Sequence, residues 1–236
     1  MSLPVEFSDI APQYWALEGG GGCGKDTAVG VLAPEITHLT GRIVVTTREP
    51  GGTPQAEIIR EQIFKAKGKK AWTGLQIVDG FNRARVLLVE DFIKPNLCAG
   101  RHVLTDRYAA STWAYEGGGE GVPFDLIEEM HLKRVGLFGP DATFYLRLSA
   151  PKIGLRRKPK HMDNDAFDLE TVEYQRRVHA VYDRLYEENH NPDNINPIFG
   201  LWYLIDADCP PDQVAVQLQQ KVRQHLELQE SRKIFL

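Results

Sequence analysis

Five short apolar segments stand out along the chain, each bounded by glycine, proline or polar residues. Most of them are rich in β-branched and aromatic side chains, and their length favours buried strands over helices. The predicted strands cover residues 14–17, 42–47, 101–105, 142–148 and 201–205.

Between these segments, apolar residues recur at a spacing that is typical of helices. Pro34 interrupts or ends the first predicted helix, and Pro95 stops the third. Polar, glycine-rich or proline-rich stretches indicate loops at 65–70, which is basic, and at 116–121 and 189–197. The predicted helices cover residues 28–36, 55–65, 75–93, 109–115, 124–137, 168–188 and 214–228.

The order of these elements predicts the fold class. Strands alternate with helices, and each strand is mostly apolar, which is typical of a parallel sheet with helices on both faces. No internal repeat and no linker divides the chain. We therefore expect a single α/β domain over residues 1–236, with a five-stranded parallel sheet in three layers.

Composition narrows the class of protein. The 236 residues are 42% hydrophobic and 25% charged, and the net charge is −4. This balance is ordinary for a globular protein and gives no basic field for nucleic acid or a membrane surface. Three cysteines without metal-ligand spacing indicate free thiols. With no signal pattern and no long apolar run, we expect a cytoplasmic location.

One motif carries the first chemical signal. A strand ends in a glycine-rich loop followed by a lysine, which matches G-x-x-x-x-G-K-[ST] except at the last position. Glycines let backbone N–H groups surround a phosphate, and the lysine reaches the terminal phosphates. A flexible turn is the alternative. The predicted ATP-binding residues are Gly19, Gly20, Gly21, Gly22, Cys23, Gly24, Lys25, Asp26 and Thr27.

Further polar residues follow the other strands. In a parallel sheet, ligands bind at the carboxyl ends of the strands, where these residues meet. Asp106 is placed to hold Mg²⁺ beside a phosphate loop, or alternatively to cap a helix. Arg48 and Arg107 are placed to bind a second phosphate, or to form surface ion pairs. A basic stretch at 151–165 follows the fourth strand.

The motifs together resemble those of the thymidylate (dTMP) kinase family, a P-loop nucleoside monophosphate kinase fold. The resemblance rests on the glycine loop, on REPGGTP at 48–54 and on DRYAASTWAY at 106–115, in this order. It extends over residues 13–225. It implies transfer of the γ-phosphoryl group of ATP to dTMP with Mg²⁺, and a basic lid at about 151–167.

The resemblance also implies roles for single residues on the acceptor side. Phe81 would stack on the thymine ring, and Arg85 would donate to its O4 atom. Thr112 would line the base edge, and Tyr115 would crowd a ribose 2′-OH. Glu116 stands where many bacterial members have glutamine, and it would accept the N3–H of thymine.

Catalysis would depend on charge neutralisation around the transferred phosphoryl group. Lys25 and Arg107 would supply positive charge there, and the lid would add Arg156 or Arg157. Arg48 and Arg107 would hold the acceptor phosphate. Asp26 and Asp106 are the predicted ligands of Mg²⁺.

The chain departs from the family pattern at several positions. Gly21 replaces an acidic residue, which predicts weaker or less selective sugar binding. Asp26 replaces the hydroxyl residue that usually holds Mg²⁺, and we expect it to ligate the metal directly, with Thr27 as the alternative. In the lid, Asp165 and Ala166 stand where many relatives have Asp-Arg.

Two alternatives to a dTMP kinase remain open at this stage. Because an ionised Glu116 also suits the N1–H and 2-amino group of guanine, a kinase of broader or shifted base specificity, for example for dGMP, is the first. A nucleotide binder without catalysis is the second. The resemblance further implies a homodimer through residues 75–93.

Overall fold

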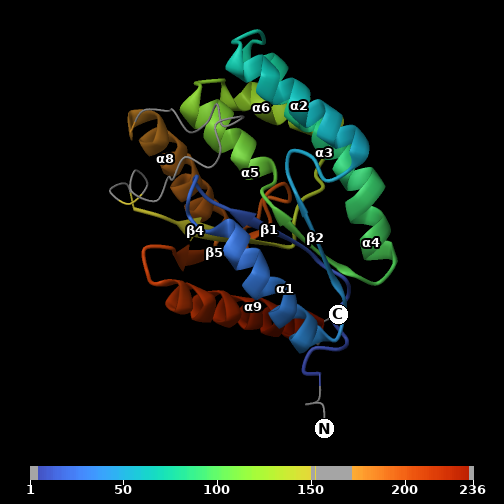
Figure 1. Ribbon diagram of the computed structural model, residues 1–236. Coiled ribbons are helices and arrows are strands. Elements are labelled where there is room, and N and C mark those ends of the chain that lie inside the picture. The colour runs from blue at the N-terminus through green and yellow to red at the C-terminus, as the bar shows by residue number, and fades with distance from the viewer. Residues whose placement is uncertain (1–4, 150–151, 153–171, 234–236) are drawn as a thin grey trace.

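The computed structural model describes residues 5–149, 152 and 172–233. Its centre is a five-stranded parallel sheet with the strand order β2-β3-β1-β4-β5 (Figure 1). This confirms the predicted sheet, and no strand end differs from its predicted position by more than two residues. The strands are β1 (Tyr14–Glu18), β2 (Val44–Arg48), β3 (His102–Asp106), β4 (Ala142–Arg147) and β5 (Leu201–Asp206).

Helices cover both faces of the sheet, as Figure 1 shows. Alternate residues of each strand point to opposite faces. Tyr14 and Ala16 of β1 therefore join one hydrophobic core, and Trp15 and Leu17 join the other. The second core is closed by α1 (Lys25–Thr40) and α9 (Pro211–Lys233).

The remaining helices also carry the acceptor-side residues. They are α2 (Pro54–Gly68), α3 (Gly74–Leu88), α4 (Lys94–Cys98), α5 (Ala109–Thr112), α6 (Phe124–Arg134) and α8 (Val172–Asn189), with two π-helical segments, η1 (Val89–Ile93) and η2 (Trp113–Gly119). All of them except α2 close the first core, whereas α2 packs on α3 in a third hydrophobic cluster. Within the described part of the chain, no helix is both long and apolar enough to cross a bilayer.

Two predicted helix ends at prolines are wrong. Pro34 lies inside α1, which continues to Thr40. Pro95 lies in the first turn of α4, directly after the π-helical segment η1. A proline near the start of a helix is tolerated because its position needs no intrahelical N–H donor. The helical segment that was predicted for residues 75–93 therefore continues through α3, η1 and α4 to Cys98.

Two of the predicted loops are also wrong. The basic stretch at 65–70 is mostly helical, because α2 continues to Gly68. The glycine-rich stretch at 116–121 is helical up to Gly119, within η2. Tertiary contacts outweigh the low helix propensity of glycine here, since Gly117 and Gly119 pack against Phe124 and Tyr174 so closely that no side chain would fit. Apart from residue 152, the predicted lid lies outside the described residues.

Candidate active site

The glycine loop lies between the carboxyl end of β1 and the start of α1. Gly19 has a φ of 144°, and a Cβ atom there would lie 2.6 Å from the carbonyl oxygen of Leu146. Only glycine therefore fits at this position. The Nζ atom of Lys25 donates to the carbonyl oxygens of Gly19 (3.2 Å) and Gly20 (3.3 Å), so the lysine lies folded over the loop.

Gly20 allows the side chain of His179 on α8 to come close to the phosphate loop. Gly20 has no side chain, and the imidazole of His179 occupies the space that a Cβ atom would take. His179 is 8% exposed. Helix α8 therefore packs directly on the phosphate loop, a contact that motif analysis of the loop did not foresee.

Arg107 approaches the same loop from the end of β3. Its backbone has a φ of 73°, an uncommon conformation for a residue other than glycine. The Nη1 atom donates to the carbonyl oxygen of Gly19 (3.1 Å) and to Oγ of Ser111 (3.0 Å). Its guanidinium lies 5.1 Å from the ring centroid of Tyr115. The predicted donor-side Lys25 and acceptor-side Arg107 thus meet at a single carbonyl oxygen.

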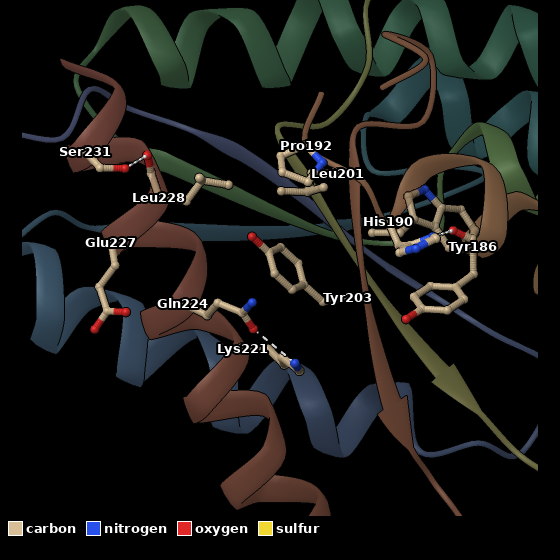
Figure 2. Close-up of a pocket in the computed structure, with 11 residues that line it drawn as sticks. Tyr186, His190, Pro192, Leu201, Tyr203, Lys221, Gln224, Glu227, Leu228 and Ser231 are labelled. Atoms are coloured by element: carbon tan, nitrogen blue, oxygen red, sulfur yellow. Dashed lines mark hydrogen bonds between the residues drawn. The ribbon is translucent and has the colours of Figure 1, made fainter. Parts of the chain in front are cut away.

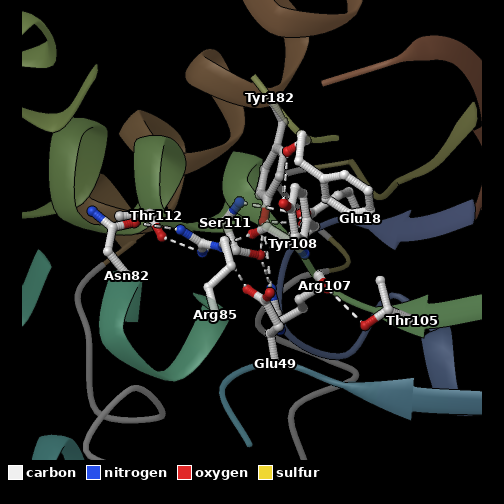
Figure 3. A network of polar contacts seen from close by, with 11 residues as sticks. Glu18, Glu49, Asn82, Arg85, Thr105, Arg107, Tyr108, Ser111, Thr112 and Tyr182 are labelled. Atoms are coloured by element: carbon white, nitrogen blue, oxygen red, sulfur yellow. Dashed lines mark hydrogen bonds and ion pairs between the residues drawn. The ribbon is translucent and has the colours of Figure 1, made fainter. Parts of the chain in front are cut away.

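Glu18 is a central residue that the sequence analysis missed. Its carboxylate is fully buried and accepts hydrogen bonds from the backbone N–H of Tyr108 (2.8 Å), Oγ of Ser111 (2.7 Å) and the hydroxyl of Tyr182 (3.0 Å) (Figure 3). Burial raises the pKa of this carboxyl, and the charge of Arg107 opposes the shift. A carboxylate that ends an otherwise apolar strand was the available signal.

Arg85 lies in a fully buried cluster beside this network (Figure 3). It donates to Oε2 of Glu49 (2.9 Å), to Oδ1 of Asn82 (2.7 Å) and to Oγ1 of Thr112 (2.9 Å). Burial raises the pKa of Glu49 to about 7, although the charge of Arg85 opposes the shift. The structure thus brings Arg85 and Thr112 together and adds Glu49 and Asn82 as partners of Arg85.

Glu116 is buried and forms an ion pair with Lys67 of α2, with 2.6 Å between Oε1 and Nζ. Burial raises the pKa of Glu116, and the charge of Lys67 opposes this rise. The expectation that residues 65–70 form a solvated loop is therefore also wrong for Lys67, whose side chain is 10% exposed. The lysine is held in the interior by a charge far away in the sequence.

Other predicted residues lie further from this centre. Arg48 is half exposed and pairs with Glu57 of α2 (2.9 Å), although β2 places it in register with Asp106. Phe81 is partly buried and packs against the cluster between α2 and α3. Arg156 and Arg157 lie outside the described residues.

Asp106 and Asp26 suit a magnesium ion in different ways. The Oδ1 atom of Asp106 is buried and meets no donor among the described residues. Such an oxygen is a suitable hard ligand. Asp26 is exposed in the first turn of α1, next to Lys25. Both carboxylates lie at the rim where the phosphate loop ends, so the residues present fit the metal.

A separate cavity of about 520 Å³ lies away from this rim (Figure 2). It is bounded by the end of α8, the start of β5 and the second half of α9. Its strand residues, including Leu201 and Tyr203, open β5, whereas the phosphate loop follows the end of β1. The cavity is therefore at the other end of the sheet from the candidate site.

Comparison with known proteins agrees with this geometry. The model of the family described as thymidylate kinase matches residues 17–196. A crystal structure of thymidylate kinase from Ehrlichia chaffeensis is similar, with a TM-score of 0.66 and 26% sequence identity. The similarity covers 91% of this chain and 100% of that chain.

Proposed function

Because the chain belongs to the thymidylate kinase family, we propose that it transfers the γ-phosphoryl group of ATP to dTMP, giving ADP and dTDP. Membership of this family makes the protein a phosphotransferase with a nucleotide kinase fold. Our proposal adds that ATP is the phosphoryl donor, that dTMP is the acceptor and that the reaction needs Mg²⁺. A homodimer through the segment that matches α3, and a cytoplasmic location, remain predictions.

One observation carries the proposal. Lys25 and Arg107 donate to the carbonyl oxygen of Gly19 over 3.2 Å and 3.1 Å, one from the donor loop and one from the acceptor side. Phosphoryl transfer needs the two phosphate groups side by side within a region of positive charge. When nucleotides bind, both cations can exchange this oxygen for phosphate oxygens.

Each further step depends on residues of this chain. The N–H groups of the loop and of the start of α1 would bind the donor phosphates. Arg107 would hold the acceptor phosphate, with Arg48 at the next strand end. Because that phosphate is already anionic, its attack needs no general base. Asp26 and Asp106 would hold Mg²⁺, which would neutralise charge on the donor phosphates.

The test is release of ADP from ATP and Mg²⁺ in the presence of dTMP, measured with a coupled assay. Turnover supports the proposal, while binding of dTMP without turnover would favour the non-catalytic alternative. Arg107→Lys should lower kcat/KM at least about tenfold, because an ammonium cannot replace a bidentate guanidinium. Arg134→Lys is the matched control, since Arg134 pairs with Asp79 on the surface.

A second candidate, a kinase of shifted base specificity, is favoured by the buried carboxyl group of Glu116, which pairs with Lys67. A carboxylate can accept from the N1–H and 2-amino groups of guanine as well as from the N3–H of thymine. Comparison of dTMP with dGMP in the same assay decides between them, and a higher kcat/KM for dGMP would replace dTMP as the acceptor.

A further inference from the structure

The end of η2 is helical although its sequence disfavours a helix. Gly117, Gly118 and Gly119 are the last three residues of this π-helical segment. Glycine loses more conformational freedom in a helix than any other residue, so three in succession oppose helix formation. The conformation at this end of η2 therefore depends on contacts from other parts of the molecule.

Helix α8 packs on this end of η2 at very short range. A Cβ atom on Gly118 would lie 2.6 Å from Cγ2 of Val181 and 2.9 Å from the carbonyl oxygen of Arg177. A Cβ atom on Gly119 would overlap the ring of Tyr174. The glycines therefore allow α8 and η2 to approach more closely than residues with side chains would.

Arg177 of α8 also caps the end of η2. Its Nε atom donates to the carbonyl oxygen of Gly118 (3.0 Å), and its Nη2 atom donates to that of Gly119 (2.7 Å). The last carbonyl groups of a helix have no N–H partner within that helix, and cationic side chains stabilise them. One guanidinium thus satisfies two such carbonyl groups and fixes η2 to α8.

The same helix contacts the phosphate loop within its next two turns. His179 lies against Gly20, in the space that a side chain there would fill. The hydroxyl of Tyr182 bonds Oε2 of Glu18 at 3.0 Å and Nη1 of Arg107 at 3.4 Å. Because α8 is continuous over 18 residues, a displacement at the loop is transmitted to the end of η2.

We propose that Arg177 is a positioning residue that couples the phosphate loop to the acceptor side of the site. A nucleotide at the loop would hold α8 against η2, and η2 would then keep the ring of Tyr115 at its distance of 5.1 Å from the guanidinium of Arg107. When one ligand orders a shared element, the second ligand binds more tightly. This cooperativity between donor and acceptor rests on the proposed function, whereas the connection through α8 does not.

Calorimetric titration of dTMP tests the cooperativity. The dissociation constant is measured for the protein alone and with a saturating non-hydrolysable ATP analogue and Mg²⁺. We expect the analogue to tighten dTMP binding about tenfold in the wild type and less than about threefold in Arg177→Gln. A wild-type ratio near one, or an equal ratio in the variant, would overturn the proposal.

Arg176→Gln is the matched control. Arg176 is the neighbouring residue on α8, is exposed and pairs with Glu173 (3.1 Å) on its own helix. This change removes the same charge and should keep the wild-type ratio. Thermal unfolding of both variants separates stability from coupling. A destabilised Arg177→Gln protein that keeps the full ratio would assign Arg177 a structural role alone and overturn the proposal.

Amide hydrogen exchange tests the connection with the ATP analogue alone. The N–H groups of Glu120, Gly121 and Val122 donate to carbonyl oxygens within η2, so their exchange reports whether its end is formed. The analogue with Mg²⁺ should slow this exchange about tenfold in the wild type and less than about threefold in Arg177→Gln. Binding of the analogue without this slowing would overturn the connection. If dTMP does not bind, the proposed function fails and this experiment decides the connection by itself.

If the analogue does not bind either, Gly20→Ala tests the connection without a ligand. The added methyl group displaces His179 and with it α8. Exchange of the same three amides should then accelerate at least about fivefold, because the end of η2 loses its support. The reference is the amide of Leu201, which donates to Asp141 at the other end of the sheet and should not change. No acceleration, or an equal acceleration at Leu201, would overturn the connection.

Discussion

The Nζ atom of Lys67 lies 2.6 Å from Oε1 of Glu116, and the two side chains are 10% and 1% exposed. One comes from the end of α2 and the other from η2, so the pair joins two segments that are 49 residues apart in the sequence. Because both charges are removed from water, each depends on the other for compensation.

Loss of the lysine should be strongly destabilising. Lys67→Met leaves Glu116 buried without its cation, and we expect the free energy of unfolding to fall by about 3 kcal/mol. Urea denaturation monitored by tryptophan fluorescence measures this value. Lys65→Met is the control, because Lys65 is exposed on the same helix and should change stability by less than about 0.5 kcal/mol. Equal effects of the two variants would show that the pair contributes nothing.

The buried carboxyl of Glu49 should make stability depend on pH. Its pKa is raised from 4.5 to about 7, so the folded protein binds a proton more tightly than the unfolded chain does. The stability from this proton is complete below pH 4.5 and is lost as the pH rises to about 7. The free energy of unfolding of the wild type, minus that of Glu49→Gln, should fall by about 3 kcal/mol over this range. A difference that is constant with pH would contradict the shift.

The contact of His179 with Gly20 predicts a coupled pair of substitutions. Gly20→Ala places a methyl group where the imidazole lies, so the loop or α8 must move. We expect a loss of about 1–3 kcal/mol in stability and weaker ATP binding. Adding His179→Ala should recover most of both losses, as a double-mutant cycle measures. Additive effects would mean that the two residues do not compete for the same space.

The sheet and the chemistry at its rim could be predicted from the sequence because both are local signals. Five apolar segments predicted five strands, and the motifs that follow β1, β2 and β3 lie at one end of the sheet. The helix ends at Pro34 and Pro95 could not be predicted in this way. Pro34 lies inside a continuous α-helix, and a π-helical segment precedes Pro95, so neither position follows from helix propensity alone.

The residues that support the site through hydrogen bonds and ion pairs also could not be predicted from the sequence. Glu18, Asn82 and Lys67 act through partners between 3 and 164 residues away along the chain, so no motif joins them. Nothing in a basic stretch distinguishes Lys67, which points inward, from Lys65, which is exposed. The predicted roles of Phe81, Tyr115 and Glu116 toward a base stay predictions.

Removal of the carboxylate at Asp26 tests the proposed metal ligands. Asp26→Ala should raise the Mg²⁺ concentration needed for half-maximal binding of a non-hydrolysable ATP analogue by about tenfold, because one hard oxygen ligand is lost. Tryptophan fluorescence during a Mg²⁺ titration measures this. Thr27→Val is the matched variant. A shift with Thr27→Val and none with Asp26→Ala would assign the metal to the hydroxyl instead.

The hydroxyl of Tyr182 should position Arg107 for catalysis. It donates to Oε2 of Glu18 (3.0 Å) and accepts from Nη1 of Arg107 (3.4 Å), so it links the buried carboxylate to the guanidinium. Tyr182→Phe keeps the aromatic packing and removes this link. We expect kcat to fall about tenfold while the KM for ATP stays within about twofold, because the loss concerns alignment of the acceptor phosphate.

The control for this variant is Tyr145→Phe. The Tyr145 ring stacks on Tyr182 with centroids 5.5 Å apart, and its hydroxyl bonds Asp183 (3.0 Å), so it removes a hydroxyl from the same cluster without touching Arg107. If the two variants lose similar stability but only Tyr182→Phe lowers kcat, the role of the Tyr182 hydroxyl is to position Arg107. If both variants lowered kcat equally, the effect would come from the packing of α8. Arg107 would then be held in place by its hydrogen bonds to Gly19 and Ser111.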